Sequence, residues 1–230
     1  MAHKEQKDFI QYVKNKFPAF FREKFILDIG SLDINGNNKE FFENCGYIGV
    51  DLNYGRNVDI VCKGHELLLP DSTFDVVIST EALEHDPFYP ETLKNMYRLL
   101  KPGGLFVFTC ATTGRPEHGT RQTSPEDAPF VAGNPEFENY YKNLTEKDIR
   151  EVMNICELFK DYEFIVNPVT CDLYFWGLKI GEFKEHKGYS FLNVKQPEIS
   201  LLIKRIEELE KEKQELENKL MKIKLRRLKH

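Results

Sequence analysis

Apolar residues along this chain occur in two patterns, short continuous runs and wider spacings of three and four residues. The short runs predict strands near residues 24–30, 46–52, 58–63, 74–80 and 104–110. Helices are expected between most of these strands, which predicts a parallel sheet with right-handed crossovers. Before the first strand, apolar residues recur at helical spacing up to Pro18 and predict an amphipathic helix. Its apolar positions are Phe9, Ile10, Val13 and Phe17.

The second half of the pattern begins with a polar segment rich in Gly and Pro, from Thr112 to Pro135. This segment is too long for a simple connector and predicts a lid or an acceptor-binding loop. A helix is predicted near Thr145–Cys156. The pair Tyr162–Val166 and Leu173–Ile180 predicts an antiparallel hairpin.

From Ile199 the apolar positions alternate steps of three and four, with charged residues between them. This heptad pattern predicts a coiled coil and favours a parallel dimer. Its d-type positions are Leu202, Leu209, Leu216 and Ile223. The alternative is a single amphipathic helix folded back on the body. The basic stretch Lys219–Lys229 is either a solvated helix end or an attraction for an anionic partner.

Composition narrows the function classes. A chain of 230 residues with 41% hydrophobic residues can bury one sizeable core and carry an appendage. The formal net charge of −5 argues against general nucleic-acid binding. No apolar run approaches the roughly 20 residues of a membrane span, and the charged first residues lack the apolar core of a signal peptide. We therefore expect a cytoplasmic protein, and its five scattered cysteines predict neither a zinc site nor a disulfide framework.

The first two predicted strands end in residues that suit a nucleoside. The run Phe25–Leu27 leads into Asp28-Ile29-Gly30-Ser31, and the run Tyr47–Val50 ends in Asp51. A carboxylate at the end of the second strand can accept hydrogen bonds from both ribose hydroxyls. The Gly-rich dinucleotide fingerprint is absent, so the turn predicts an adenosine ligand without a pyrophosphate.

Three further motifs follow in a fixed order: the strand F-D-V-V-x-S from Phe74, the segment E-x-L-E-H from Glu81, and the turn L-L-K-P-G-G from Leu99. Over roughly Lys24 to Ile180 the chain resembles the class I S-adenosylmethionine-dependent methyltransferases. The runs at 30–37, 111–120 and 140–145 resemble, more narrowly, small-molecule O-methyltransferases of bacterial or viral surface-glycan synthesis.

The resemblance implies an α/β fold with a Rossmann-like, mostly parallel seven-stranded sheet and an antiparallel last strand. It also implies S-adenosylmethionine as the cofactor. The predicted organisation is an N-terminal helix at residues 1–22, a methyltransferase domain at 23–183, a linker at 184–197 and a coiled-coil helix at 198–230.

The resemblance also implies roles for the nucleoside site. Asp28 would face the cofactor's amino group, and Asp51 would hold the ribose. The backbone of Gly30 and Ser31 would pass beside the methionine part, where a side chain at position 30 would collide with the cofactor. The alternatives are that Asp28 only caps the turn and that Asp51 caps a helix.

The adenine end of the predicted site departs from the family. Many relatives carry an acid after the third strand, but here that place reads Lys63-Gly64-His65-Glu66. Adenine would then be recognised by backbone groups near Gly64 and His65, or by Glu66. The predicted cofactor site also includes Leu52, Thr80 and Glu81.

Two histidines are candidate catalytic residues. Methyl transfer requires the acceptor atom, the methyl carbon and the sulfur in line, and an aliphatic hydroxyl needs a base that titrates near neutrality. Histidine suits this role, and His85 and His118 follow the fourth and fifth strands, at the ligand-binding edge of such sheets. The alternative for His85 is a structural cap of the next helix. A metal site of His85, Asp86, Glu117 and His118 is conceivable, but we predict no metal.

Four more residues are candidates for the acceptor. Arg115 and Arg121 flank His118, and guanidinium groups bind phosphate or carboxylate bidentately. Tyr140 and Tyr141 could stack on a sugar ring. The alternatives are surface charges for the arginines and core positions for the tyrosines.

The predicted function is methyl transfer from S-adenosylmethionine to an oxygen of a polar small molecule, a sugar or sugar-phosphate unit of a surface glycan. The alternatives are a phosphorus-bearing capsule acceptor and a cofactor-binding scaffold that recruits partners through the coiled coil. The expected partner is a second copy of the chain or a glycan-synthesis protein. A nucleic-acid methyltransferase is disfavoured because no N-P-P-Y-type tetrapeptide follows strand 74–80.

Overall fold

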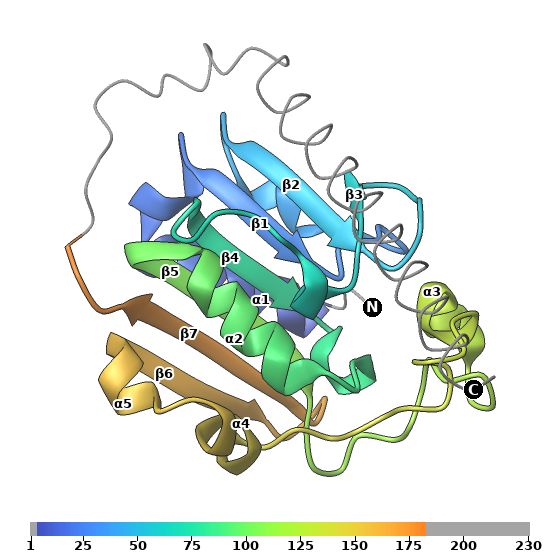
Figure 1. Ribbon diagram of the computed structural model, residues 1–230. Helices are drawn as coiled ribbons and strands as arrows, with labels where there is room; N and C mark the ends of the chain where they lie inside the picture. Colours follow the sequence, from blue (N-terminus) through green and yellow to red (C-terminus); the bar gives the residue numbers. More distant parts are fainter. Residues whose placement is uncertain (1–3, 183–230) are drawn as a thin grey trace, which may run out of the picture. The chain divides into compact units, whose positions relative to one another are not determined.

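The computed structural model describes residues 4–182, which form a single twisted sheet with helices on both faces (Figure 1). The strands are β1 (Phe25–Ile29), β2 (Gly46–Asp51), β3 (Ile60–Val61), β4 (Phe74–Thr80), β5 (Leu100–Ala111), β6 (Phe159–Asn167) and β7 (Asp172–Lys179). Their order in the sheet is β3-β2-β1-β4-β5-β7-β6. Strands β1 to β5 pair in parallel, whereas β7 runs antiparallel to both β5 and β6. The predicted fold class is confirmed.

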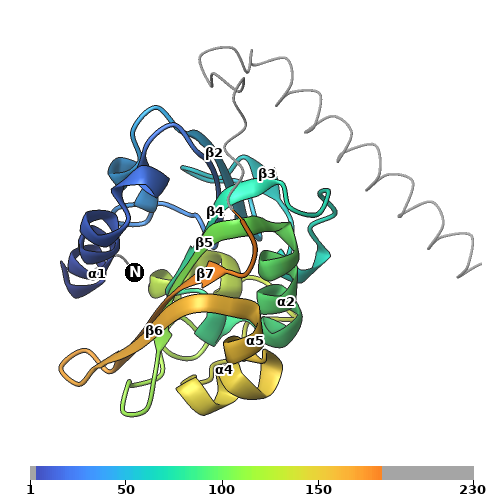
Figure 2. The ribbon, with the colours of Figure 1, turned by 90° about the vertical axis from the view of Figure 1, so that its left-hand side faces the viewer.

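Helix α1 (Lys4–Lys16) covers one face of the sheet, and the short 3-10 helix η1 (Pro18–Phe21) follows it (Figure 2). The buried side of α1 consists of Phe9, Ile10 and Val13, at the spacing that the sequence predicts. These residues belong to one core cluster with alternate residues of the strands, which include Ile26, Ile78, Val107 and Trp176.

The opposite face is covered by α2 (Tyr89–Leu99), α4 (Glu146–Val152) and α5 (Ile155–Leu158) (Figure 2). Leu93, Met96 and Leu99 of α2 are buried at helical spacing. Stacked Phe108 and Phe175, with ring centroids 5.1 Å apart, extend an aromatic core across β5 and β7. Helices thus shield both faces of the sheet from solvent. Because both faces are buried, the central strands are nearly continuous apolar runs.

The prediction of helices between most strands is wrong. Among the four connections that join β1 to β5 in the described residues, only the one from β4 to β5 contains an α-helix. The earlier connections carry the 3-10 helices η2 (Asn38–Phe41) and η3 (Gly64–Glu66). The β1–β2 connection holds Gly30, Gly36 and a cluster of asparagines, and these residue types disfavour helix. The predicted helix at Thr145–Cys156 is two helices, because the chain is extended at Met153.

The predicted linker at 184–197 and coiled coil at 198–230, with its basic end, lie outside the described residues. Within residues 4–182, no helix has both the length and the apolar character that a bilayer span requires.

Candidate cofactor and acceptor site

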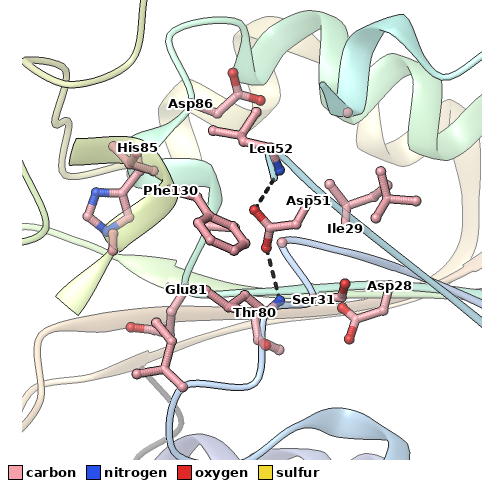
Figure 3. Close-up of a pocket in the computed structure, with 18 of the residues that line it drawn as sticks. Asp28, Ile29, Ser31, Asp51, Leu52, Thr80, Glu81, His85, Asp86 and Phe130 are labelled. Atoms are coloured by element: carbon pink, nitrogen blue, oxygen red, sulfur yellow. Dashed lines mark hydrogen bonds between the residues drawn. The ribbon is translucent and has the colours of Figure 1, made fainter. Parts of the chain in front are cut away.

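The candidate site is a pocket at the carboxyl ends of β1, β2 and β4 (Figure 3). Open parallel sheets place their ligands at this edge. The pocket is open to solvent at its mouth, and polar and apolar residues line it together, as in many small-molecule sites. The predicted site residues that line it are Asp28, Gly30, Ser31, Asp51, Leu52, Gly64, Thr80, Glu81 and His85.

Asp51 stands at the end of β2, and Figure 3 shows its two hydrogen bonds to backbone amides. The amide of Leu32 donates to Oδ2 at 2.9 Å, and the amide of Leu52 donates to Oδ1 at 2.7 Å. Burial raises the pKa of the carboxyl, and these amides oppose that rise. A carboxylate oxygen has two lone pairs, so each oxygen of Asp51 keeps one for a ribose hydroxyl.

Asp28 lies deeper in the pocket, on β1. The hydroxyl of Tyr47 donates to its Oδ2 in a short hydrogen bond, and Asn38 Nδ2 lies 3.3 Å from the same oxygen. Burial raises the pKa of Asp28 to about 7, while the hydrogen bonds from Tyr47 and Asn38 lower it. The carboxyl therefore sits where a cationic group, such as the amino group of a methionine moiety, would favour its ionised form.

Gly30 turns the chain out of β1 with φ of 78°. An added Cβ would lie 2.4 Å from the Cβ of Ala82, which follows β4. The expected collision at this position is thus with Ala82, independently of any cofactor. The neighbouring Glu81 adopts φ of 51°, which few residues other than glycine do, and its carboxylate accepts a hydrogen bond from Thr109 at 2.8 Å.

The pocket lining around Gly64 differs from the set of residues predicted for the adenine. Gly64 lines the pocket, but His65 and Glu66 are not among its lining residues. The ring of His65 packs on Phe88 instead, with centroids 4.3 Å apart. The acid at this end is Asp86, whose carboxylate accepts from the Phe88 amide at 2.8 Å.

The polar segment predicted as a lid or acceptor loop does cover the pocket. It contains η5 (Pro125–Asp127) and α3 (Pro129–Ala132), and Ala128, Phe130 and Val131 line the space. The Phe130 ring lies against Gly55, and Lys63 pairs with Glu136, which comes just after the segment.

Further lining residues were missed in the sequence analysis: Gln6, Asn38, Phe130 and Phe137. The buried side of α1 carries one polar residue, Gln6, among apolar ones, and that irregularity was the available signal. Phe130 and Phe137 gave no signal, because single aromatic residues in a polar loop fit many arrangements.

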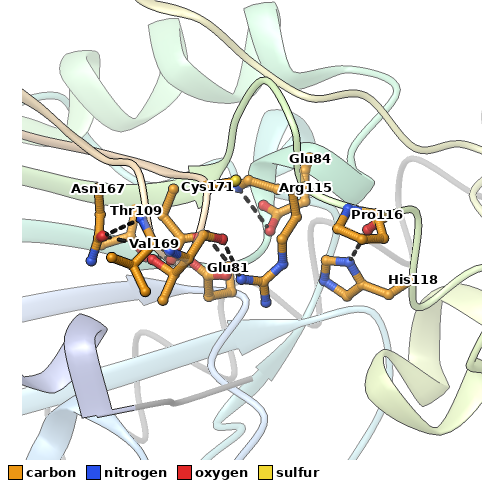
Figure 4. Close-up of polar contacts among 12 residues, drawn as sticks. Glu81, Glu84, Thr109, Arg115, Pro116, His118, Asn167, Val169 and Cys171 are labelled. Carbon is orange, nitrogen blue, oxygen red and sulfur yellow. Dashed lines mark hydrogen bonds and ion pairs between the residues drawn. The ribbon is translucent and has the colours of Figure 1, made fainter.

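The two candidate catalytic histidines meet at one end of the pocket. Their ring centroids are 5.0 Å apart, and Tyr141 lies 5.4 Å from His85 and 5.1 Å from His118. Figure 4 shows His118 beside the loop that carries Pro116, whose carbonyl oxygen lies 3.1 Å from Nδ1 of His118. His85 lines the pocket, whereas His118 is not among the lining residues and packs against the ring of His85.

These two histidines have different environments. His85 is 3% exposed, and burial together with His118 lowers its pKa to about 3, so its imidazole is neutral. The adjacent Glu84 is fully buried, and burial and Glu81 raise its pKa to about 8. His118 is more exposed than His85 and is the more accessible of the two rings.

The arginines predicted for the acceptor are already paired. Arg115 donates to the Thr170 carbonyl at 2.7 Å and to Asp172 at 3.3 Å. Arg121 donates to Glu138 at 3.0 Å. Neither arginine is among the lining residues of the pocket.

The two tyrosines predicted for the acceptor differ in their relation to the histidines. Tyr141 belongs to the histidine cluster, and its hydroxyl donates to the Pro116 carbonyl at 3.1 Å. Tyr140 is partly buried, and burial raises its pKa to about 12. Neither tyrosine is among the lining residues of the pocket.

A family model described as a methyltransferase domain matches residues 27–108. The match begins within β1, ends within β5, and includes Asp28, Gly30 and Asp51. Residues 27–108 are therefore similar to a methyltransferase domain. S-adenosylmethionine is the cofactor that this match supports.

Curated relatives resemble parts of the chain. A ubiquinone/menaquinone biosynthesis C-methyltransferase of Rickettsia prowazekii is 29% identical over 120 residues, 48% of each chain. A demethylmenaquinone methyltransferase of Listeria welshimeri is 39% identical over 62 residues, 26% of this chain and 25% of the relative. The chain thus spans at most about half the length of these relatives, and they do not show the narrower resemblance to glycan O-methyltransferases.

Solved structures share the fold. The phosphoethanolamine N-methyltransferase 2 of Haemonchus contortus, solved with S-adenosyl-L-methionine, is similar at a TM-score of 0.53 and 16% identity, over 76% of this chain and 53% of that one. The CurJ carbon methyltransferase gives a TM-score of 0.51 at 16% identity, over 75% of this chain and 52% of that one. At such identity the likeness concerns the fold.

Proposed function

We propose that this protein transfers the methyl group of S-adenosylmethionine to a small-molecule acceptor that enters beside His85 and His118. The observation that carries the proposal is Asp51, a pocket carboxylate at the end of β2 within the residues similar to a methyltransferase domain. Asp51 would hold the ribose, and Asp28 would face the amino group. Gly64 and Asp86 lie where the adenine would bind.

Methyl transfer requires no covalent bond between the protein and the substrate. The methyl–sulfur bond breaks as the bond from methyl to the acceptor atom forms. The sulfonium keeps the electron pair and becomes a neutral thioether, and the acceptor loses a proton. The enzyme must align the three atoms and exclude water. We assign activation of the acceptor to His118, and its role as general base stays a prediction.

An oxygen acceptor is the first candidate, because a hydroxyl must lose its proton and two histidines lie at this end of the pocket. A sugar or sugar-phosphate acceptor stays a prediction from the narrower resemblance. The paired state of Arg115 and Arg121 gives an anionic acceptor no unpaired guanidinium from these two residues.

A carbon acceptor is the second candidate. The curated relative from Rickettsia prowazekii is named a C-methyltransferase. In addition, Phe130 and Phe137 line the pocket with aromatic rings, which suit a planar, apolar acceptor.

A turnover assay tests the proposal. Release of S-adenosylhomocysteine is measured with nucleotide-sugars, short glycans, phenols and quinols as acceptors, for the native protein and for His118→Ala. We expect the variant to lose about 100-fold in rate, the lower range for proton-transfer catalysis, with unchanged cofactor affinity. His65→Ala, outside the pocket lining, is the matched control and should retain its rate.

The outcomes separate the candidates. A product methylated on carbon supports the second candidate. Cofactor binding without turnover on any acceptor supports a scaffold, and a full rate in His118→Ala contradicts the assignment of the acceptor end.

A further inference from the structure

Three potential ligand residues gather at the acceptor end of the pocket. One ligand atom each from Glu84, His85 and His118 lies within 4.8 Å of the others. Glu84 and His85 belong to the 3-10 helix η4 (Leu83–His85), while His118 comes from the loop after β5. From this juxtaposition we infer that the three residues form a binding site for a divalent transition-metal ion, with zinc the best match. The catalytic role of this ion rests on the proposed function, whereas the binding of the ion does not.

Two buried atoms in the cluster have no protein partner. Glu84 Oε2 and His85 Nδ1 are shielded from solvent and form no hydrogen bond among the described residues. Glu84 is 0% exposed, and its other oxygen accepts a hydrogen bond from the Ala111 amide at 3.2 Å. Buried polar atoms are normally satisfied, so unsatisfied ones point to a missing ligand.

The surroundings of His118 resemble those of a metal-binding histidine. A carbonyl oxygen can only accept, so the 3.1 Å contact between Nδ1 of His118 and Pro116 O places the proton on Nδ1. Nε2 is then the atom with a free lone pair. Metal-binding histidines commonly fix their tautomer in this way, by donating the other ring N–H to a backbone carbonyl.

The same carbonyl oxygen of Pro116 accepts a hydrogen bond from the hydroxyl of Tyr141 at 3.1 Å. The Tyr141 ring also packs against both imidazoles. Tyr141 thus contacts the Pro116 carbonyl and both histidine rings, and these contacts help to fix the positions of the two imidazoles.

The donor set selects the class of ion. Two imidazoles and one carboxylate are the protein ligands of many catalytic zinc sites, which keep an open position for water or substrate. Calcium and magnesium prefer an all-oxygen set. With mutual distances of at most 4.8 Å, the three atoms lie at most about 2.8 Å from a common centre. Zinc–nitrogen bonds are about 2.1 Å, so each ligand would close by about 0.7 Å or less.

The site differs from the metal site weighed in the sequence analysis. Asp86 does not belong to the cluster of ligand atoms, and its two oxygens accept from the Phe88 amide and the Thr92 hydroxyl. Glu117 accepts from the Thr120 hydroxyl at 2.8 Å. Glu84 takes their place, since η4 brings it beside His85 in the interior.

The position gives the ion a role in the proposed reaction. His85 lines the pocket, so the open coordination position would face the acceptor. A metal ion held there would make a bound hydroxyl oxygen more acidic, and the proton would pass to water. The ion would then replace His118 as the group that activates the acceptor, because Nε2 of His118 would be a metal ligand and not a base.

Metal titration of the full-length, untagged protein tests the inference. After removal of metals with a chelator, zinc binding is measured by competition with a chromophoric chelator, and cobalt binding by visible absorption. We expect one ion per chain with micromolar or tighter affinity, and no thiolate charge-transfer band. Glu84→Gln and His118→Ala should each weaken binding at least about tenfold. Asp86→Asn and His65→Ala are matched controls and should bind as the native protein does.

Two results would overturn the inference: no binding at micromolar zinc, or binding that survives both Glu84→Gln and His118→Ala. His118 lies on an exposed loop, so its variant keeps the test valid even if Glu84→Gln fails to fold. Cofactor affinity is measured on the same samples. A native protein that binds zinc but not S-adenosylmethionine would refute the proposed function and leave the metal site standing.

Discussion

At the scale of single residues, Asp28 is a carboxyl group in an unusual environment. Its carboxyl is buried between Tyr47 and Asn38 on the side of the sheet that α1 covers. Burial raises its pKa to about 7, against about 3.9 for an unfolded chain. The folded protein therefore holds this proton more tightly than the unfolded chain does.

The sign of the effect on stability follows from linkage. The stabilisation from the retained proton is complete below about pH 4 and is lost as the pH rises through about 7. Asp28→Asn removes this dependence. Relative to the native protein, the variant should gain up to about 4 kcal/mol in unfolding free energy between about pH 4 and pH 8. Urea denaturation at both pH values measures the change.

Asp33 provides a control, because its substitution should change stability with pH in the opposite direction. A hydrogen bond from the Gly36 amide lowers its pKa, so Asp33→Asn should lose stability relative to the native protein as the pH rises. An Asp28→Asn variant whose difference from the native protein is the same at both pH values would contradict the buried, proton-retaining carboxyl.

The sequence predicted which residues line the pocket best where a motif fixes a position near the end of a strand. Asp28 and Asp51 follow directly from the strand runs, and both line the pocket. His65 and Glu66 were chosen by their distance along the chain from the third strand. The η3 turn directs His65 onto Phe88, whereas Asp86, from another connection, lines the pocket. Contacts between distant segments are not encoded in local spacing.

At the scale of elements, the close approach between the end of β1 and the residues after β4 shapes the pocket. Gly30 has φ of 78°, and a Cβ there would lie 2.4 Å from that of Ala82. Gly30→Ala therefore adds backbone strain and a steric clash, and we expect it to lower the unfolding free energy by about 2 kcal/mol or more. Chemical denaturation measures this loss.

Gly133 is the matched control for that substitution. Its φ is −98°, and the nearest atom to an added Cβ is the Pro129 carbonyl oxygen at 3.5 Å. Gly133→Ala should change stability by less than about 0.5 kcal/mol. Equal stability of the two alanine variants would show that the β1 turn has more room than the structure gives it.

The sequence predicted strands better than helices, for a physical reason. A buried strand needs only a short apolar run, and β1, β2 and β4 have such runs. The connection at residues 30–45 contains enough residues for a helix, but its glycines and asparagines favour turns. Family order alone could not reveal that η2 replaces the usual helix.

At the scale of the whole molecule, the two halves of the proposed reaction rest on different support. The family match at residues 27–108 covers the strands that carry Asp28 and Asp51. His118, Tyr141 and the segment around Phe130 lie beyond it, so the family match does not support the acceptor end. The predicted coiled coil and the dimer it would form stay predictions.

The most direct measurement is calorimetric titration of S-adenosylmethionine into the native protein, Asp51→Ala and Asp59→Ala. Asp59 is the matched control, because its carboxylate also accepts a backbone amide, that of Gly49 at 2.8 Å, but does not line the pocket. Two hydrogen bonds to a charged group contribute about 3 kcal/mol or more, so Asp51→Ala should weaken binding at least about 100-fold. Asp59→Ala should bind as the native protein does. Unchanged affinity in Asp51→Ala would contradict the placement of the cofactor in this pocket.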